Sequence, residues 1–234
     1  MPGTLFLIPA PLGDETRPWL PEPERQRVTH ITHFVVEAEK TARRHLKALG
    51  VTTPIRELTL LPLNEHTRAT EVTALLAPLH AGHDVGLISE AGCPAVADPG
   101  AQLVALAHEH GIRVVPLIGP SSILLALMAS GANGQRFAFL GYLPVDAAER
   151  SRAIRELEAR SRSANETQVF IETPYRNHAL LQQLRETLAP ATRLAVAVDL
   201  TLPEETVISR RVADWPQCAP NLHKRPAIFV VHAA

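Results

Sequence analysis

The stretch that most constrains the fold runs from residue 87 to residue 100 and reads LISEAGCPAVADPG. A short apolar run, Val85 to Ile88, leads into this stretch and stops abruptly at Ser89-Glu90. An apolar run that feeds small and rigid residues is typical of a buried parallel strand and its following loop, where open α/β sheets bind ligands. Because loops this rich in Gly and Pro are costly unless something approaches the main chain, we expect a ligand here. The alternative is a tight strand–helix connection with an ordinary helix cap.

Composition bounds the class of protein. Hydrophobic residues make up 46% of the 234 residues, enough for a buried core in one large or two small domains. The net charge of −1 provides no global basic field for nucleic acid, although a local basic patch is compatible with it. Two cysteines, Cys93 and Cys218, define no disulfide framework. We see no signal-peptide pattern and no apolar run near the ~18 residues of a membrane helix, and therefore expect a cytoplasmic protein.

Strand and helix patterns alternate along the first half of the chain. We expect strands at 4–8, 33–36, 57–63, 85–88 and 113–117, and helices from about Glu22 and at 37–49, 70–80 and 101–110. This alternation predicts a mostly parallel sheet. In the second half we expect helices at 123–128, 147–160 and 178–188, and strands at 137–142, 167–172, 193–200, 205–211 and 227–231. The strand at 205–211 turns back, so the second sheet should be mixed.

A break near residues 117–122 divides the chain into two predicted α/β domains, 1–117 and 118–234. Trp19 and Trp215 each lie near prolines and are expected in surface loops or interfaces.

Three Pro- or Gly-rich loops follow predicted strands, at 9–13, 89–94 and 118–122. None is a dinucleotide fingerprint or a Walker loop. Their order and spacing resemble the tetrapyrrole methylase superfamily, the class III S-adenosylmethionine-dependent methyltransferases. Within it, the chain most resembles the ribosomal RNA small-subunit methyltransferase I family, which methylates a cytidine 2′-hydroxyl. The resemblance runs almost end to end, and its specific part is the pattern Ser-Glu-Ala-Gly-x-Pro-x-x-x-Asp-Pro-Gly at 89–100.

The resemblance implies a homodimer, RNA as the acceptor, and S-adenosylmethionine bound in a cleft between the two domains. The residues that it implies for one side of the donor are Pro11, Ser89, Glu90, Ala91, Gly92 and Ala95. Those for the other side are Ser121, Ser122, Phe170, Ile171 and Ala227. We expect a polar contact to the donor from Glu90, whose alternative role is an acid at a helix N-terminus.

Several positions depart from the family pattern. Glu90 stands where the family usually has Asp, Cys93 where it usually has Thr, and Tyr175 where it usually has His. The presumed substrate residues therefore match less well than the donor loops. Groups that could orient or deprotonate an acceptor hydroxyl are Glu37, Glu39, Glu65, His66, Glu172 and Arg176. None has triad spacing, and we predict Glu172 and Arg176 as the catalytic pair, with a plain salt bridge between them as the alternative.

Lys40, Arg43, Arg44 and Lys47 share one face of a predicted helix. This face would contact RNA phosphates, or be only a solvated surface. The eleven histidines provide no third ligand beside any close pair, so we expect no metal site. Two other functions are compatible with the sequence. One is methyl transfer to a tetrapyrrole-like or other small molecule, and the other is a non-catalytic S-adenosylmethionine-binding protein.

Overall fold

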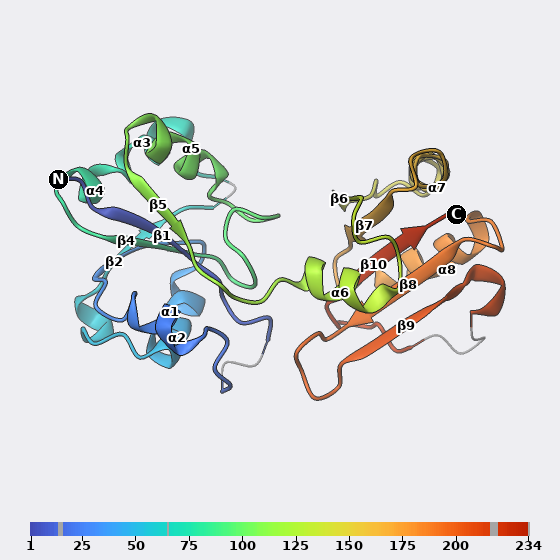
Figure 1. Cartoon of the computed structure of the whole chain (residues 1–234), viewed down its shortest axis with the longest axis horizontal. Coiled ribbons are helices and arrows are strands. Elements are labelled where there is room, and N and C mark those ends of the chain that lie inside the picture. Colours follow the sequence, from blue (N-terminus) through green and yellow to red (C-terminus); the bar gives the residue numbers. More distant parts are fainter. Residues whose placement is uncertain (14–15, 65, 216–219, 234) are drawn as a thin grey trace. The chain divides into compact units, whose positions relative to one another are not determined.

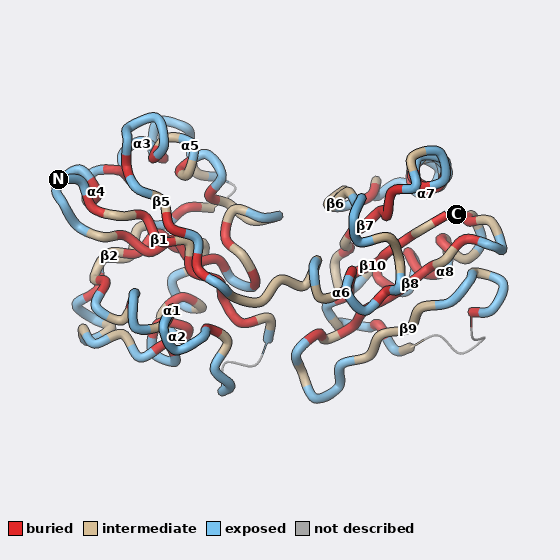
Figure 2. The backbone as a smooth tube through the Cα atoms, in the orientation of Figure 1, coloured by how far each residue is buried: buried red, intermediate tan, exposed pale blue. Residues whose placement is uncertain are grey.

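The computed structural model describes residues 1–13, 16–64, 66–215 and 220–233. The chain divides into two compact units, Met1–Ser121 and Ser122–Ala234. Each unit has its own five-stranded sheet (Figure 1). Buried residues follow the central strands of both sheets, as Figure 2 shows. The predicted fold class, two α/β domains with a parallel sheet in the first and a mixed sheet in the second, is thus confirmed. No helix among the described residues is long and apolar enough to cross a membrane.

The sheet of the first unit is entirely parallel, with strand order β3-β2-β4-β1-β5. Its strands are β1 (Thr4–Ile8), β2 (His33–Val36), β3 (Thr59–Pro62), β4 (Val85–Ile88) and β5 (Arg113–Pro116). Every residue of β4 is buried, which explains why this strand reads as a continuous apolar run. All five carboxyl ends lie along one edge, so the loops that follow the strands meet there.

Helices cover both faces of this sheet (Figure 1). They are α1 (Glu22–Gln26), α2 (Glu39–Leu49), α3 (Ala69–Ala74), α4 (Ala77–His80) and α5 (Ala101–Glu109), with a short 3-10 helix, η1, at Ile55–Glu57. Side chains of α2 pack with Phe6 and Ile8 on one face, whereas those of α3, α4 and α5 pack with Leu5 on the other. The chain leaving β1 therefore goes one way to β2, and the chain leaving β4 goes the other way to β5.

The helix predicted over 70–80 is wrong as a single element. It is broken into α3 and α4 at Leu75 and Leu76. The reason is Pro78, which has no N–H to donate to the carbonyl of Ala74 and cannot continue a helix across this point. The apolar spacing of Val72, Leu75, Leu76 and Leu79 continues over the break because all four side chains still enter the core.

The second unit has a mixed sheet of order β6-β7-β10-β8-β9, in which only β6 and β7 pair in parallel. Its strands are β6 (Phe137–Tyr142), β7 (Thr167–Ile171), β8 (Arg193–Val198), β9 (Thr206–Arg211) and β10 (Ala227–His232). Its helices are α6 (Ser122–Ser130), α7 (Ala147–Ala164) and α8 (Asn177–Thr187), with a 3-10 helix, η2, at Val212–Asp214. Trp215 does not lie in a surface loop: it is 5% exposed, and its indole N–H donates to the Leu194 carbonyl at 3.0 Å.

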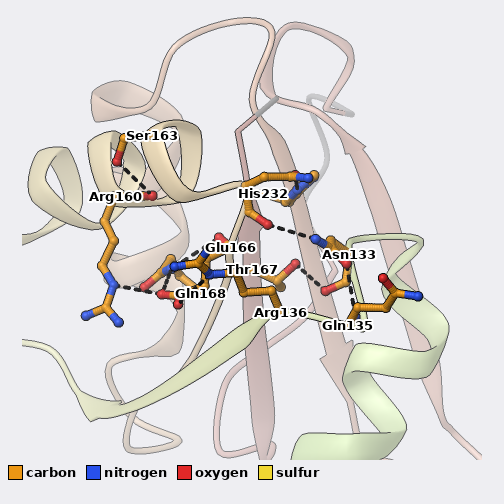
Figure 3. A network of polar contacts seen from close by, with 10 residues as sticks. Asn133, Gln135, Arg136, Arg160, Ser163, Glu166, Thr167, Gln168 and His232 are labelled. Carbon is orange, nitrogen blue, oxygen red and sulfur yellow. Dashed lines mark hydrogen bonds and ion pairs between the residues drawn. The ribbon is translucent and has the colours of Figure 1, made fainter.

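A polar network fixes the amino end of β7 (Figure 3). The Glu166 carboxylate accepts from Arg160 Nε at 2.7 Å and from Gln168 Nε2 at 2.9 Å, and these hydrogen bonds lower its pKa, the one from Gln168 most. Thr167 Oγ1 donates to the Asn133 carbonyl at 2.8 Å. These contacts hold the amino end of β7 against α7 and the segment before β6. They thereby fix the position of the strand whose carboxyl end leads to Glu172.

Candidate functional site

The three predicted loops of the first unit meet at the carboxyl edge of the parallel sheet. Ala10 and Gly92 exchange two main-chain hydrogen bonds, of 2.8 and 3.1 Å. Cys93 Sγ lies 3.5 Å from the Pro120 carbonyl and donates to it. The loop after β4 thus contacts the loops after β1 and after β5. Residues separated by about 30 to 80 positions in the sequence form one cluster, which we call the donor loops (9–13, 89–100 and 117–121).

The donor loops surround the place where the sheet changes winding direction. Strands β1 and β4 are neighbours, and the connections that leave them go to opposite sides and opposite faces of the sheet. In open α/β sheets this arrangement leaves a crevice at the carboxyl ends of the two strands, which is where their ligands bind. The topology therefore points to the same loop that the sequence singles out.

Among the described residues of the first unit, left-handed backbone at residues other than glycine occurs in the loop after β4. Ala95 and Ala97 have φ angles of 65° and 62°, in the left-handed region that alanine rarely adopts. Gly92, at φ 73°, is suited to this region because it has no Cβ. Such strain persists only where the surroundings impose it, and it is typical of ligand sites.

Three carboxylates lie close together at this edge: Glu37, Glu90 and Asp98. Glu90 Oε1 accepts from Thr41 Oγ1 at 2.9 Å, and the Glu90 N–H donates to Glu37 Oε2 at 3.4 Å. Burial, followed by the charges of Glu37 and Glu90, raises the pKa of Asp98 to about 6, against a hydrogen bond from Ser89 that lowers it. Neither Glu90 nor Asp98 pairs with a Lys or Arg that the structure describes. The cluster therefore offers negative charge to a cationic ligand.

The predicted donor residues of the second unit lie at the ends of β7, β10 and α6. Phe170 is completely buried and stacks on Phe229 in the core at a centroid distance of 5.8 Å, so only its main chain can contact a ligand. Ile171 pairs with Ile228, which brings the end of β7 beside Ala227 at the start of β10. Ser122 begins α6, directly after Ser121.

The predicted catalytic pair lies directly after β7. Arg176 Nη2 and Nε donate to Glu172 Oε1 at 2.7 and 3.0 Å, and the Thr173 N–H donates to the same oxygen at 2.6 Å. The salt bridge named as the alternative is thus present. The Glu172 side chain is fully buried and that of Arg176 is 37% exposed. Glu172 Oε2 has no hydrogen-bond partner in the part of the chain that the structure describes. In this geometry Arg176, rather than Glu172, presents atoms to solvent.

The other groups considered for the acceptor are dispersed. Glu37 lies beside Glu90, whereas Glu39 pairs with Arg43 at 2.9 Å. His66 is exposed in a turn in which its N–H donates to Asn64 Oδ1, and Glu65 lies outside the described residues. Across the described ranges, no three His, Cys, Asp or Glu side chains are arranged to hold a metal ion.

The basic face of α2 is a solvent-facing surface on which the Arg43 side chain is held in place. Lys40, Arg44 and Lys47 are exposed. Arg43 pairs with Glu39 and also donates to the Ile55 carbonyl at 3.3 Å. The opposite face of the helix is buried in the core.

Asp98 lies in the same cluster as Glu90 and Ser89 but is absent from the sequence-based donor set. Its position in Ala97-Asp98-Pro99-Gly100 is visible in the sequence, but its closeness to Glu37, more than 60 positions earlier, is not. The contact of Cys93 with Pro120 likewise has no signal in the sequence, because it depends on β4 and β5 flanking β1.

Comparisons with known proteins agree with this architecture. Residues 25–215 match the family model of the tetrapyrrole (corrin/porphyrin) methylases. The chain is 32% identical over 238 residues to the ribosomal RNA small subunit methyltransferase I of Pseudomonas aeruginosa, covering 98% of this chain and 78% of the relative. The protein of the same name from Mesorhizobium japonicum is 41% identical over 138 residues, which is 59% of this chain and 46% of that one.

Solved structures show the same fold. The methyltransferase CobJ superposes with a TM-score of 0.65 at 20% identity, covering 99% of this chain and 95% of the other. The cobalt precorrin-4 methyltransferase CbiF superposes with a TM-score of 0.60 at 16% identity, covering 98% and 94%. The match of most of the chain to one family model, together with a relative at 32% identity over 98% of this chain and 78% of its own length, identifies the family. The chain belongs to the tetrapyrrole methylase family and is an S-adenosylmethionine-dependent methyltransferase.

Proposed function

We propose that this methyltransferase modifies RNA of the small ribosomal subunit, at the ribose 2′-hydroxyl of a cytidine. The observation that carries the proposal is the similarity to ribosomal RNA small subunit methyltransferase I over 98% of the chain. The family resemblance of the sequence implies the same acceptor, whereas the loop patterns themselves concern the methyl donor. A ribosomal acceptor would also place the enzyme in the cytoplasm.

We propose that the donor lies against the donor loops, with contacts from Pro11, Ser89, Glu90, Ala91, Gly92, Ala95 and Ser121. The structure of these loops fits such a ligand. S-adenosylmethionine is a sulfonium cation with an ammonium group, and the loops place the carboxylates of Glu90 and Asp98 together without a cationic partner among the described residues. The small side chains and the left-handed residues Gly92, Ala95 and Ala97 allow a ligand to approach the main chain closely. Ser122, Phe170, Ile171 and Ala227 are the proposed contacts from the second unit.

When bound, the donor supplies an electrophilic methyl group for in-line transfer to the acceptor oxygen. Because positioning provides much of the rate of such a transfer, the main task of the chain is to hold both partners. We propose that Arg176 contacts the acceptor and that Glu172 fixes its orientation. Three hydrogen bonds converge on Glu172 Oε1, so the guanidinium is held before the acceptor arrives.

We also propose that the enzyme is a homodimer. Several large apolar side chains of the second unit are exposed, namely Met128, Val145, Tyr142 and Phe137, at 79, 65, 59 and 39%. Scattered single apolar residues need no explanation, but this many on one small unit favour a protein partner. Sedimentation equilibrium of the purified chain should give twice the monomer mass of 25.5 kDa, and a monomer at all concentrations would contradict this.

The acceptor is tested by incubating the protein with methyl-labelled S-adenosylmethionine and purified small ribosomal subunits. We expect label in the RNA and, after nuclease digestion, in 2′-O-methylcytidine. If label enters only small molecules of a cell extract, the acceptor is a small molecule. If the donor binds but no extract fraction is labelled, the protein is a non-catalytic S-adenosylmethionine-binding protein.

A further inference from the structure

Two distant segments of the second unit form a single surface beside Arg176. The turn after β7 and the start of α8, residues 172–178, are joined to residues 221–225 by three hydrogen bonds. The Lys224 N–H donates to the Pro174 carbonyl at 3.2 Å, and the Leu222 N–H donates to His178 Nε2 at 3.1 Å. Asn177, which is 0% exposed, donates from Nδ2 to the Arg225 carbonyl at 2.7 Å. The arrangement of this surface is therefore fixed from beneath.

The surface presents an aromatic ring with a cation over it. Tyr175 is 72% exposed, Lys224 Nζ lies 5.8 Å from its ring centroid, and the His223 ring meets it nearly edge-on at 6.4 Å. We call Tyr175, His223 and Lys224 the Tyr175 surface. The Tyr175 ring is exposed on a backbone that is fixed from beneath, and its neighbours are polar, so the surface is not part of an apolar core.

The charges around this surface are not all neutralised. Arg176 is paired with Glu172 and Arg225 with Asp199. Lys224 forms no ion pair with a carboxylate of the described residues, so its charge remains available. Its backbone φ of 59° is in the left-handed region, which lysine rarely adopts. The backbone is therefore strained at the residue whose side chain lies over the ring.

We propose that the Tyr175 surface binds a single-stranded segment of the RNA acceptor, with one base stacked on Tyr175 and a phosphate at Lys224. This rests on the proposed ribosomal RNA acceptor. An exposed aromatic ring interleaved with cations is how proteins hold unpaired nucleotides, since every base has a face to stack and every nucleotide has a phosphate. The charge of Lys224, which no carboxylate of the described residues pairs with, favours a polyanion over a protein partner, because lysine is depleted in protein interfaces.

Binding of a single-stranded RNA of about 12 nucleotides carrying 5-iodouridine tests the stacking contact. Tyr175→Ala should weaken binding about tenfold, and the ultraviolet crosslink of the wild type should map to Tyr175. Tyr175→Phe should bind like the wild type, because the ring is retained. The matched control is His108→Ala, which removes an exposed ring of α5, outside the Tyr175 surface, and should leave binding unchanged.

Lys224→Gly separates the RNA contact from a structural role. Glycine relieves the left-handed strain, so the melting temperature should stay the same or rise. RNA binding should nevertheless weaken, and its salt dependence should fall by about one unit of slope because one phosphate is no longer neutralised. A lysine with only a structural role would show neither effect on RNA binding.

Methyl transfer to small ribosomal subunits by the wild type tests the ribosomal RNA acceptor separately from the role of the Tyr175 surface. If the wild type methylates the RNA and Tyr175→Ala binds the oligonucleotide normally, the Tyr175 surface is not the RNA contact although the proposed function stands. If Tyr175→Ala binds naked RNA normally but fails only on whole subunits, the surface meets a ribosomal protein and the RNA proposal is overturned. If the wild type neither binds nor methylates RNA, both proposals fall together.

Discussion

Two proposed ligand sites, the donor loops of the first unit and the Tyr175 surface of the second, both follow the end of a strand but differ in their side chains, backbone and charge. The donor loops have small side chains, left-handed main chain and clustered carboxylates. The Tyr175 surface has a large ring and cations on a turn fixed from below by buried polar groups. The first suits a cationic ligand that approaches the backbone closely, and the second suits the bases and phosphates of a polyanion.

This difference explains why the resemblance to the family is uneven along the chain. A backbone-shaped site requires Gly, Ala and Pro at fixed positions, and such residues are retained in the pattern at 89–100. A site formed by side chains can have different residues on the same supporting backbone. Tyr175, which stands where the family usually has His, keeps an exposed aromatic ring in the same turn.

The largest effect should come from Gly92→Val. The φ angle of 73° strains any β-branched residue by about 1–2 kcal/mol, and shifting the loop disturbs its bonds to Ala10. We expect donor affinity to fall about 100-fold, equivalent to about 3 kcal/mol, measured by calorimetry with S-adenosylhomocysteine.

Gly111→Val is the matched control for this variant. Gly111 has a similar φ of 65° and open space where a Cβ would lie, and it precedes β5, at the opposite edge of the same sheet. It should lose similar stability but keep donor affinity. Equal losses of donor affinity in both variants would mean that the donor loops do not form the donor site.

Arg176→Met should have the next largest effect, on stability. It leaves the Glu172 carboxylate buried and without its cation, and breaking a buried pair in this way typically costs about 3–5 kcal/mol. Because Arg176 is 37% exposed, we expect a smaller loss of about 2 kcal/mol in urea unfolding. Glu172→Gln should cost less, since solvent reaches the remaining guanidinium. The reverse order would contradict the assignment of Glu172 as the buried member of the pair.

Asp98 should give the donor loops a distinct pH dependence. Its pKa is raised from 3.8 to about 6, so the folded chain holds this proton to higher pH than the unfolded chain does. Its contribution to the unfolding free energy therefore falls as pH rises from about 4 to about 6, and remains low above that range. Thermal melting of Asp98→Asn should show a gain over the wild type that grows across this range. A constant difference would mean that Asp98 ionises normally.

The smallest effect should come from the basic face of α2. Replacing both Arg43 and Arg44 by Ala should lower the salt dependence of RNA binding by about one unit of slope for each phosphate that is no longer neutralised. Arg43 is held by Glu39 and Ile55, so we expect a change of about one unit or less, with donor affinity unchanged. No change at all would mean that this face is only solvated, and would assign RNA binding to the second unit.

Most of the fold follows from local sequence patterns. The strands at 33–36, 85–88 and 137–142 have the predicted bounds, because each is an apolar run ended by polar or turn residues. The broken helix at 70–80 shows the limit of periodicity. Its apolar spacing continues across Pro78, and only the missing hydrogen bond at that residue ends the element.

Less of the candidate site than of the fold could be predicted from the sequence. The donor loops could be predicted because Gly and Pro mark where main chain is exposed to a ligand. The left-handed conformations of Ala95 and Ala97 could not, since alanine has no preference for them. The contact between Tyr175 and Lys224 is also invisible, because it joins residues 49 positions apart through hydrogen bonds made only in the folded unit.

Amide hydrogen exchange with and without saturating S-adenosylhomocysteine tests the central claim most directly, that the main chain of the donor loops forms the donor site. We expect the ligand to slow exchange at 89–97 and 9–13, where peptide groups are exposed to the ligand, with no comparable protection along the Tyr175 surface. Protection that leaves 89–97 unchanged in a protein that binds the ligand would contradict the account.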